Sequence, residues 1–292
     1  LMGLLGILGY NIPAAALGIT FGPTLSRPEE TQMIGAYGVF FLYLFWLARH
    51  HFLNIFRQAV GFEKGMAADT QWISTRFSFW GFVIGGLGIV LWCHYFGIPF
   101  IFSFFVVGAF FLFTLVATRV ICQGGIAYFT LTAAPIDGLM AFCSSNFFTN
   151  SGIVVAGIVQ KILFVDLRES LMPSLLHTRK VTEKVSNNRW IFFTIVIVLI
   201  IGVAASFLAM LALCYKYGVR ELQFDWATRT TVAVYDNIYS LVESPQDPDK
   251  WVMIFTGVGA LVMLLLVVCY HRFYWWPIHP IGYLTAYSSA RW

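Results

Sequence analysis

The stretch from Trp190 to Tyr215, WIFFTIVIVLIIGVAASFLAMLALCY, decides the class of this protein. It contains no charged residue and exceeds the roughly 20 apolar residues with which a helix crosses the hydrocarbon core of a bilayer. Its apolar residues form an unbroken block and show neither the helical nor the strand periodicity of a half-buried element. The stretch therefore predicts a transmembrane helix.

Further apolar blocks predict an all-α, polytopic bundle of about seven or eight transmembrane spans. Plain blocks cover residues 33–48, 77–96, 98–118 and 251–270, and the short link between the second and third predicts an antiparallel hairpin. The block 1–21 is interrupted by Asn11 and Pro13, which predicts a kinked span. The more polar segment 121–165 predicts two irregular spans or one re-entrant pair.

The composition excludes a water-soluble globular protein. Hydrophobic residues make up 59% of the 292 residues and charged residues only 11%, whereas soluble domains carry roughly 25% charged residues. We expect residues 1–292 to form a single transmembrane domain. Because the chain begins at Leu1, without the features of a signal peptide, we also expect it to be part of a longer protein.

Two segments are expected to remain outside the hydrocarbon. Between residues 51 and 76, Phe52, Ile55 and Phe56 fall at helical spacing beside Arg57, which predicts a helix lying in the interface. Residues 216–250 are too polar to cross, so they are expected to form an extracytoplasmic loop. That loop is either a solvated surface or a lid.

The positions of the basic residues predict the orientation. If 121–165 crosses an even number of times, 13 of the 18 Lys and Arg residues fall on one side. The positive-inside rule makes this side cytoplasmic; it contains Arg49, Arg76, Lys180 and Arg272. With an odd number of crossings, the Lys and Arg residues after 165 would lie on the opposite side, against the positive-inside rule.

Polar side chains in and near the irregular segment are the candidates for binding a substrate or ion: Arg119, Gln123, Asp137, Asn146 and Lys161. Ionisable groups in hydrocarbon are costly and persist mainly where they face water, each other or a substrate. Asp137 follows Pro135 and could mark a broken helix; the alternative is that it caps a helix starting near Gly138. Gly124 and Gly125 indicate either unwound backbone or close helix packing.

No motif predicts an enzyme, a cofactor or a metal site. A P-loop, HExxH and GxSxG are all absent, and the five cysteines show no CxxC pair. The basic residues flank apolar blocks, so a nucleic-acid partner is not expected. His271 and His279 are the one group that could serve a lipid-modifying enzyme, but anchoring a helix end and a turn at Pro277 and Pro280 is the simpler role.

Three motifs resemble those of an uncharacterised family of bacterial multi-pass membrane proteins, a domain of unknown function distantly similar to the oligopeptide transporter superfamily. The motifs are the end of a span at Arg119 followed by Gly124-Gly125, a D-x-R-E-x-x-x-P stretch (Asp166, Arg168, Glu169 and Pro173), and a W-W-P-x-H-P-x-G-Y stretch containing Trp276, Pro277, His279, Pro280 and Gly282. The resemblance implies a transporter-like protein of the bacterial inner membrane.

Two functions are therefore expected. The first is a secondary permease for a small solute or peptide, which the broken polar segments favour. The alternative is a non-catalytic structural subunit of a larger bacterial membrane complex, which the 29 Phe, 13 Tyr and 10 Trp residues favour. The expected partners are the lipid bilayer, a small-molecule substrate or other membrane subunits.

Overall fold

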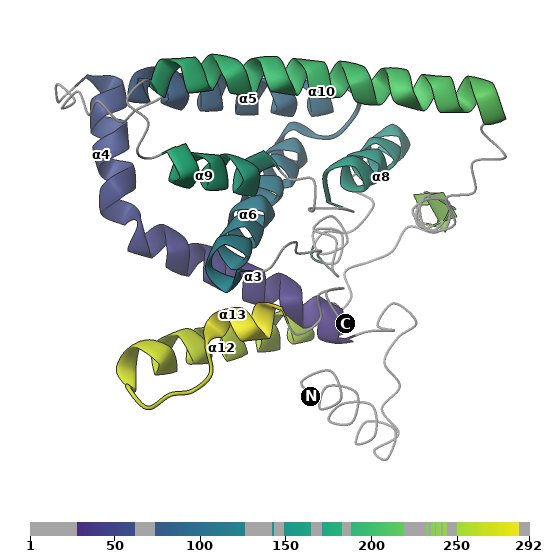
Figure 1. The fold of residues 1–292 in the computed structure, drawn as a ribbon. Helices are drawn as coiled ribbons and strands as arrows, with labels where there is room; N and C mark the ends of the chain where they lie inside the picture. The colour runs from purple at the N-terminus through teal and green to yellow at the C-terminus, as the bar shows by residue number, and fades with distance from the viewer. Residues whose placement is uncertain are drawn as a thin grey trace. The chain divides into compact units, whose positions relative to one another are not determined.

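Figure 1 shows a computed structural model of the chain. It describes residues 28–61, 74–125, 142, 149–164, 171–182, 188–218, 232, 235–236, 238–240, 242–243 and 250–285, which form helices and turns. The chain divides into two compact units. The first contains α3 (Pro28–Leu47), α6 (Phe100–Gly124), α8 (Asn150–Phe164), α12 (Lys250–Arg272) and α13 (Pro280–Leu284). The second contains α4 (Arg49–Val60) and α10 (Asn188–Tyr217). Helices α5 (Thr75–Tyr95) and α9 (Leu171–Val181) have residues in both.

The apolar helices confirm the membrane-protein class. Helices α5, α6, α10 and α12 are each long and apolar enough to cross a bilayer. Helices α3 and α4 form a bent pair around Ala48, so the described residues contain four candidate spans, or five if the pair is one span. The predicted number of seven or eight is not confirmed. It also depends on residues 1–21 and most of 121–165, which lie outside the described residues, apart from the apolar helix α8.

Helices α3 and α12 lie side by side and run in the same direction (Figure 1). A Cβ atom on Gly35 would lie 2.9 Å from the backbone nitrogen of Ala260, and one on Gly259 would lie 2.7 Å from the Cα atom of Gln32. Only glycine fits at these two positions. At the C-terminal ends of the helices, Tyr43 of α3 contacts His271 of α12, which establishes the parallel direction.

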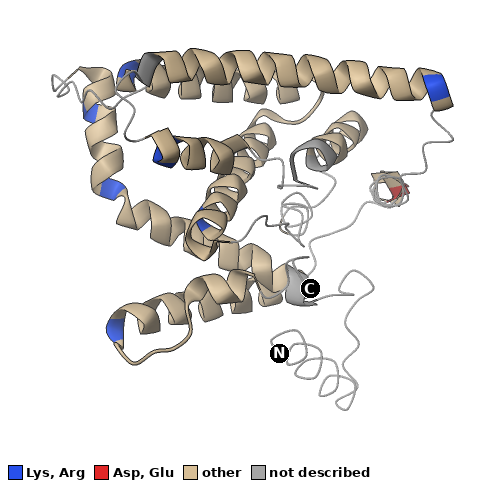
Figure 2. Cartoon of the chain, viewed as in Figure 1, with Lys and Arg blue, Asp and Glu red and all other residues tan. Residues whose placement is uncertain are grey.

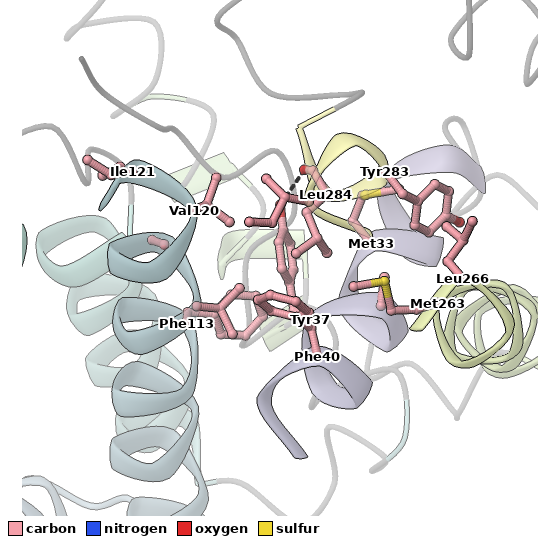
Figure 3. Close-up of a cluster of buried hydrophobic side chains, with 14 residues drawn as sticks. Met33, Tyr37, Phe40, Phe113, Val120, Ile121, Met263, Leu266, Tyr283 and Leu284 are labelled. Carbon is pink, nitrogen blue, oxygen red and sulfur yellow. Dashed lines mark hydrogen bonds between the residues drawn. The ribbon is translucent and has the colours of Figure 1, made fainter. Parts of the chain in front are cut away.

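A hydrophobic core joins α3, α6, α12 and α13 (Figure 3). Tyr37 of α3 is central to it: its ring packs edge-on against Phe113 of α6, and its hydroxyl donates a 3.4 Å hydrogen bond to the carbonyl of Leu284 in α13. Met263 of α12 is fully buried beside them. Neighbouring helices in lipid gain stability mainly from packing of this kind.

The short link between α5 and α6 is confirmed. Gly97 has a positive φ of 106°, the imidazole Nδ1 of His94 lies 3.0 Å from the carbonyl of Ile98, and Thr149 donates to the carbonyl of Gly97 over 2.7 Å. The last contact places the start of α8 on this turn. Helix α6 packs against α3, and the antiparallel hairpin of α5 and α6 stays a prediction.

In the second unit, α4 matches part of the predicted interfacial helix. Phe56 packs edge-on against Phe79 of α5, and the guanidinium of Arg76 donates to the carbonyl of Gln58. Leu53 and Val60 remain exposed beside Arg57, and the location of this helix in the interface stays a prediction. Residues 62–73 lie outside the described part.

Two predicted boundaries differ in the structure. Helix α6 continues past Arg119 by more than one turn and ends at Gly125, whose left-handed φ of 62° terminates it. Gly124 and Gly125 thus lie at a helix end, a role that the sequence did not predict. Within the predicted loop 216–250, the described residues between 232 and 243 are helical, and Tyr239 donates to the carboxylate of Glu243.

Most described Lys and Arg residues lie at helix ends (Figure 2).

Candidate functional site

The W-W-P-x-H-P-x-G-Y motif folds back onto the core after α12. The chain turns at the amide of Trp276, which donates to the carbonyl of Phe273, and then runs extended to His279. Pro280 occupies the first turn of α13, where its missing N–H costs no helical hydrogen bond. Ile281, Tyr283 and Leu284 are buried against the core, so α13 is a short helix held within the first unit.

His279 caps α13 in a defined tautomer. Its Nδ1 atom accepts a 3.2 Å hydrogen bond from the amide of Ile281, so in the neutral ring the proton resides on Nε2. Nε2 lies 3.4 Å from the side-chain amide of Gln123 at the end of α6, and the ring packs edge-on against Tyr270, 4.7 Å between centroids. The motif histidine therefore lies next to both α6 and α12.

A second histidine contact lies at the same helix ends. The hydroxyl of Tyr43 lies 2.7 Å from Nε2 of His271, and the two rings are 5.4 Å apart. The positive charge of Arg119 acts on both Tyr43 and His279. We call Tyr43, Arg119, Gln123, Tyr270, His271 and His279 the helix-end cluster.

The pKa of His279 is lowered from its ordinary value of 6.5, first because the ring is partly removed from water and second because Arg119 is nearby. Both causes disfavour the imidazolium. His279 is therefore neutral near pH 7, which keeps Nδ1 available as the acceptor for the amide of Ile281.

Buried polar side chains on α3, α6 and α12 are further candidates for binding a solute. Tyr283 of α13 donates a 3.3 Å hydrogen bond to the side-chain carbonyl of Gln32, which is only 5% exposed. Within the described part of the chain, the amide nitrogen of Gln32 and the hydroxyls of Thr114 and Thr256 have no hydrogen-bond partner. Unsatisfied polar atoms in such a place cost about 1–3 kcal/mol each unless water or a ligand meets them.

The structure brings together two of the predicted binding residues, Arg119 and Gln123, and adds His279 from the family-like motif. Lys161 lies in α8, but its side chain is not described. Asp137, Asn146, Asp166, Arg168 and Glu169 lie outside the described residues. Pro173 is buried in α9. In the motif, Pro277 precedes α13, and Gly282 has open space in front of it.

Gln32, Tyr43, Thr256 and Tyr283 were not predicted as site residues. Gln32 adjoins Glu29, Glu30 and Thr31, so it looked like part of a polar helix start. The signal that would have found it is its spacing of three residues from Gly35, which places both on the side of α3 that faces α12.

The chemistry available to these polar side chains is hydrogen bonding and charge attraction. Among the described residues, no group of three His, Cys, Asp or Glu side chains could hold a metal ion. The helix-end cluster offers donors from Arg119 and His279 beside two phenols. Such an arrangement suits binding of an uncharged polar or anionic group.

The model of one protein family, described as a family of unknown function (DUF6785), matches residues 1–291 of the chain. No curated protein and no solved structure matches it.

Proposed function

The chain belongs to this DUF6785 family of unknown function, and we propose that it is a secondary permease that moves a small solute or peptide across a membrane. The observation that supports this best is the buried, unsatisfied amide of Gln32, next to the short returning helix α13. Non-helical backbone and buried polar groups among membrane spans are typical of substrate and ion pathways. Movement of a solute along such a pathway needs no chemical step, so we propose transport without catalysis, cofactor or metal.

The polar atoms on three apolar helices support the same proposal. Gln32 lies on α3, Thr114 on α6 and Thr256 on α12, and all three side chains are buried. A structural scaffold would gain by replacing such groups with apolar ones, because hydrocarbon offers no hydrogen bonds. A transport pathway needs them as transient partners of a passing solute.

Uptake in proteoliposomes tests the permease. The probe is a mixture of isotope-labelled di- to pentapeptides, offered with and without an imposed proton gradient and read by mass spectrometry of the vesicle contents. We expect uptake by the wild type and at least a tenfold loss in Gln32→Leu, which fills the same place without the polar amide. Leu208→Ala, on an exposed position of α10, is the matched control and should transport normally. Equal uptake by wild-type and protein-free vesicles for every peptide would contradict the proposal.

The alternative is a non-catalytic subunit of a larger membrane complex. It is favoured by α10, in whose most apolar stretch no residue is buried by the described part of the chain. Purification in a mild detergent separates the two functions. Other chains at fixed stoichiometry would favour the subunit, whereas a single species containing only this chain would favour the permease.

We also propose a topology in the bacterial inner membrane, with the C-terminal ends of α3 and α12 both in the cytoplasm. Parallel packing supports it, because two parallel spans must be separated by an odd number of crossings. Helices α5, α6 and α10 supply three, so residues 121–165 would add an even number, as the basic residues also require. Reporter fusions after Ala48 and after Arg272 should report the same, cytoplasmic side; opposite sides would contradict the topology.

A further inference from the structure

We propose that the helix-end cluster binds a phosphate group at the level of the lipid headgroups, with an anionic phospholipid as its source. The proposal concerns Arg119, Gln123 and His279, with Tyr43 and His271 beside them. It does not depend on the permease, because a lipid site at the end of the spans serves any membrane protein.

The first argument is the position of the cluster. Tyr270 and His271 are within the last three residues of α12, and Gln123 is one residue before the end of α6. Exposed aromatic residues follow at once, with Phe273, Tyr274 and Trp275 all outside the core. Aromatic side chains next to a basic helix end are typical of the boundary between hydrocarbon and headgroups.

The second argument is the charge of the cluster. Among the described residues, the charges that act on Tyr43 and His279 come from Arg119 and Tyr270 and not from a carboxylate. Glu243, one of the few carboxylates that the structure describes, is already bonded to Tyr239 in the segment that precedes α12. Arg119 is exposed at this apolar surface, so an anion supplied from the membrane would balance its charge.

The third argument is a pair of donors that face each other. Because Nδ1 of His279 accepts from Ile281, its Nε2 atom carries the proton, and it lies 3.4 Å from the amide nitrogen of Gln123. Two N–H donors at this distance cannot bond each other, although rotating the amide would let Gln123 accept. A phosphate oxygen between them would accept from both and from the guanidinium of Arg119, a geometry for which arginine is well suited.

Thermal unfolding of the purified full chain in mixed micelles tests the site. The probes are phosphatidylglycerol, which has a phosphodiester and a net negative charge, phosphatidylcholine as the neutral reference, and inorganic phosphate without lipid. We expect phosphatidylglycerol to raise the unfolding temperature by several degrees over phosphatidylcholine. Its half-saturating concentration should rise about tenfold in Arg119→Gln, as expected for the loss of a charge-assisted hydrogen bond.

Controls keep the test independent of folding. Arg57→Gln removes an exposed positive charge from α4 and should retain the full phosphatidylglycerol effect. Gln123→Ala changes an exposed side chain, so it should fold normally while weakening the effect. Arg119→Lys should retain part of the stabilisation by phosphatidylglycerol. The uptake assay with Gln32→Leu is separate, so failure of the permease leaves this result unaffected.

The outcomes are distinct. A stabilisation that depends on Arg119 and appears with phosphatidylglycerol alone supports a lipid source, and the same dependence with inorganic phosphate supports the phosphate site with a soluble source. Equal stabilisation by phosphatidylglycerol in wild type, Arg119→Gln and Gln123→Ala would overturn the proposal. So would an Arg119→Gln variant that is less stable by the same amount with and without the lipid, because that marks a purely structural role at the end of α6.

Discussion

Helices α12 and α10 are similar in composition but differ in what surrounds them. Both are long, apolar and contain glycine, and both meet the length and composition of a membrane span. In α12, Gly259 faces the backbone of Gln32, whereas no atom of the described residues lies within 4 Å of a Cβ placed on Gly202 of α10. Apolar composition therefore brings a helix into the bilayer, but small residues lead to packing only where another backbone meets them.

Substituting the contact glycines should have the largest effect. We expect Gly259→Leu or Gly35→Leu to lower the free energy of unfolding by about 3 kcal/mol or more, because the added side chain overlaps backbone that cannot move without separating α3 from α12. Tryptophan fluorescence during heating in detergent measures the loss of stability. Gly257→Leu and Gly202→Leu, which meet open space, are the controls and should change stability little. Similar losses of stability in all four variants would contradict the difference between the contact glycines and the other glycines.

A cavity in the core should have the second largest effect on stability. Met263 of α12 is fully buried and Leu208 of α10 is 64% exposed, so the same kind of truncation tests packing in the two helices. We expect Met263→Ala to cost about 2 kcal/mol and Leu208→Ala less than about 0.5 kcal/mol. The unfolding temperatures of the two purified variants measure this difference in stability. A larger loss for Leu208→Ala would show that α10 has a partner of its own.

The hydrogen bond between Tyr283 and Gln32 should contribute less. Tyr283→Phe removes the donor and leaves both ends of the buried amide of Gln32 unsatisfied, so we expect a loss of about 1 kcal/mol. Gln32→Leu combined with Tyr283→Phe should recover most of that loss, because no polar group then remains unpaired. A double-mutant cycle of unfolding measures the coupling. Strictly additive effects would mean that the two side chains do not interact.

Protonation of His279 should have the smallest effect. Because its pKa is lowered in the folded protein, the stability it contributes is present above its ordinary value of 6.5 and is lost as pH falls through the lowered pKa. The groups facing it are Tyr270, Arg119 and Gln123. We expect a loss of less than about 1 kcal/mol, since protonated Nδ1 can no longer accept from Ile281.

Unfolding temperatures between pH 7 and pH 5 check this expectation. His279→Asn is the matched variant, because asparagine keeps an N-cap acceptor but does not titrate. Its unfolding temperature should fall less steeply over this range than that of the wild type. Equal slopes would place the pH dependence elsewhere in the chain.

Part of the candidate site could be predicted, and part could not. Arg119 and Gln123 stood out because polar residues are rare in apolar blocks, a property visible in any single segment. Their contact with His279 could not be predicted, because Gln123 and His279 are 156 residues apart in the sequence. Gln32 was missed for a related reason: its burial comes from α12 and α13, which lie far along the chain.

The amino-acid sequence is enough to predict a helical membrane protein and the positions of its plain spans, because the length and apolarity of a segment are local properties that match the bilayer directly. Contacts between distant segments establish which glycines pack against a neighbouring helix, which polar groups are buried and where the W-W-P-x-H-P-x-G-Y segment folds back. In hydrocarbon, every apolar helix face is equally soluble in lipid. Only the shapes and hydrogen-bonding groups of distant segments can therefore select one packing of α3, α6, α12 and α13 over another.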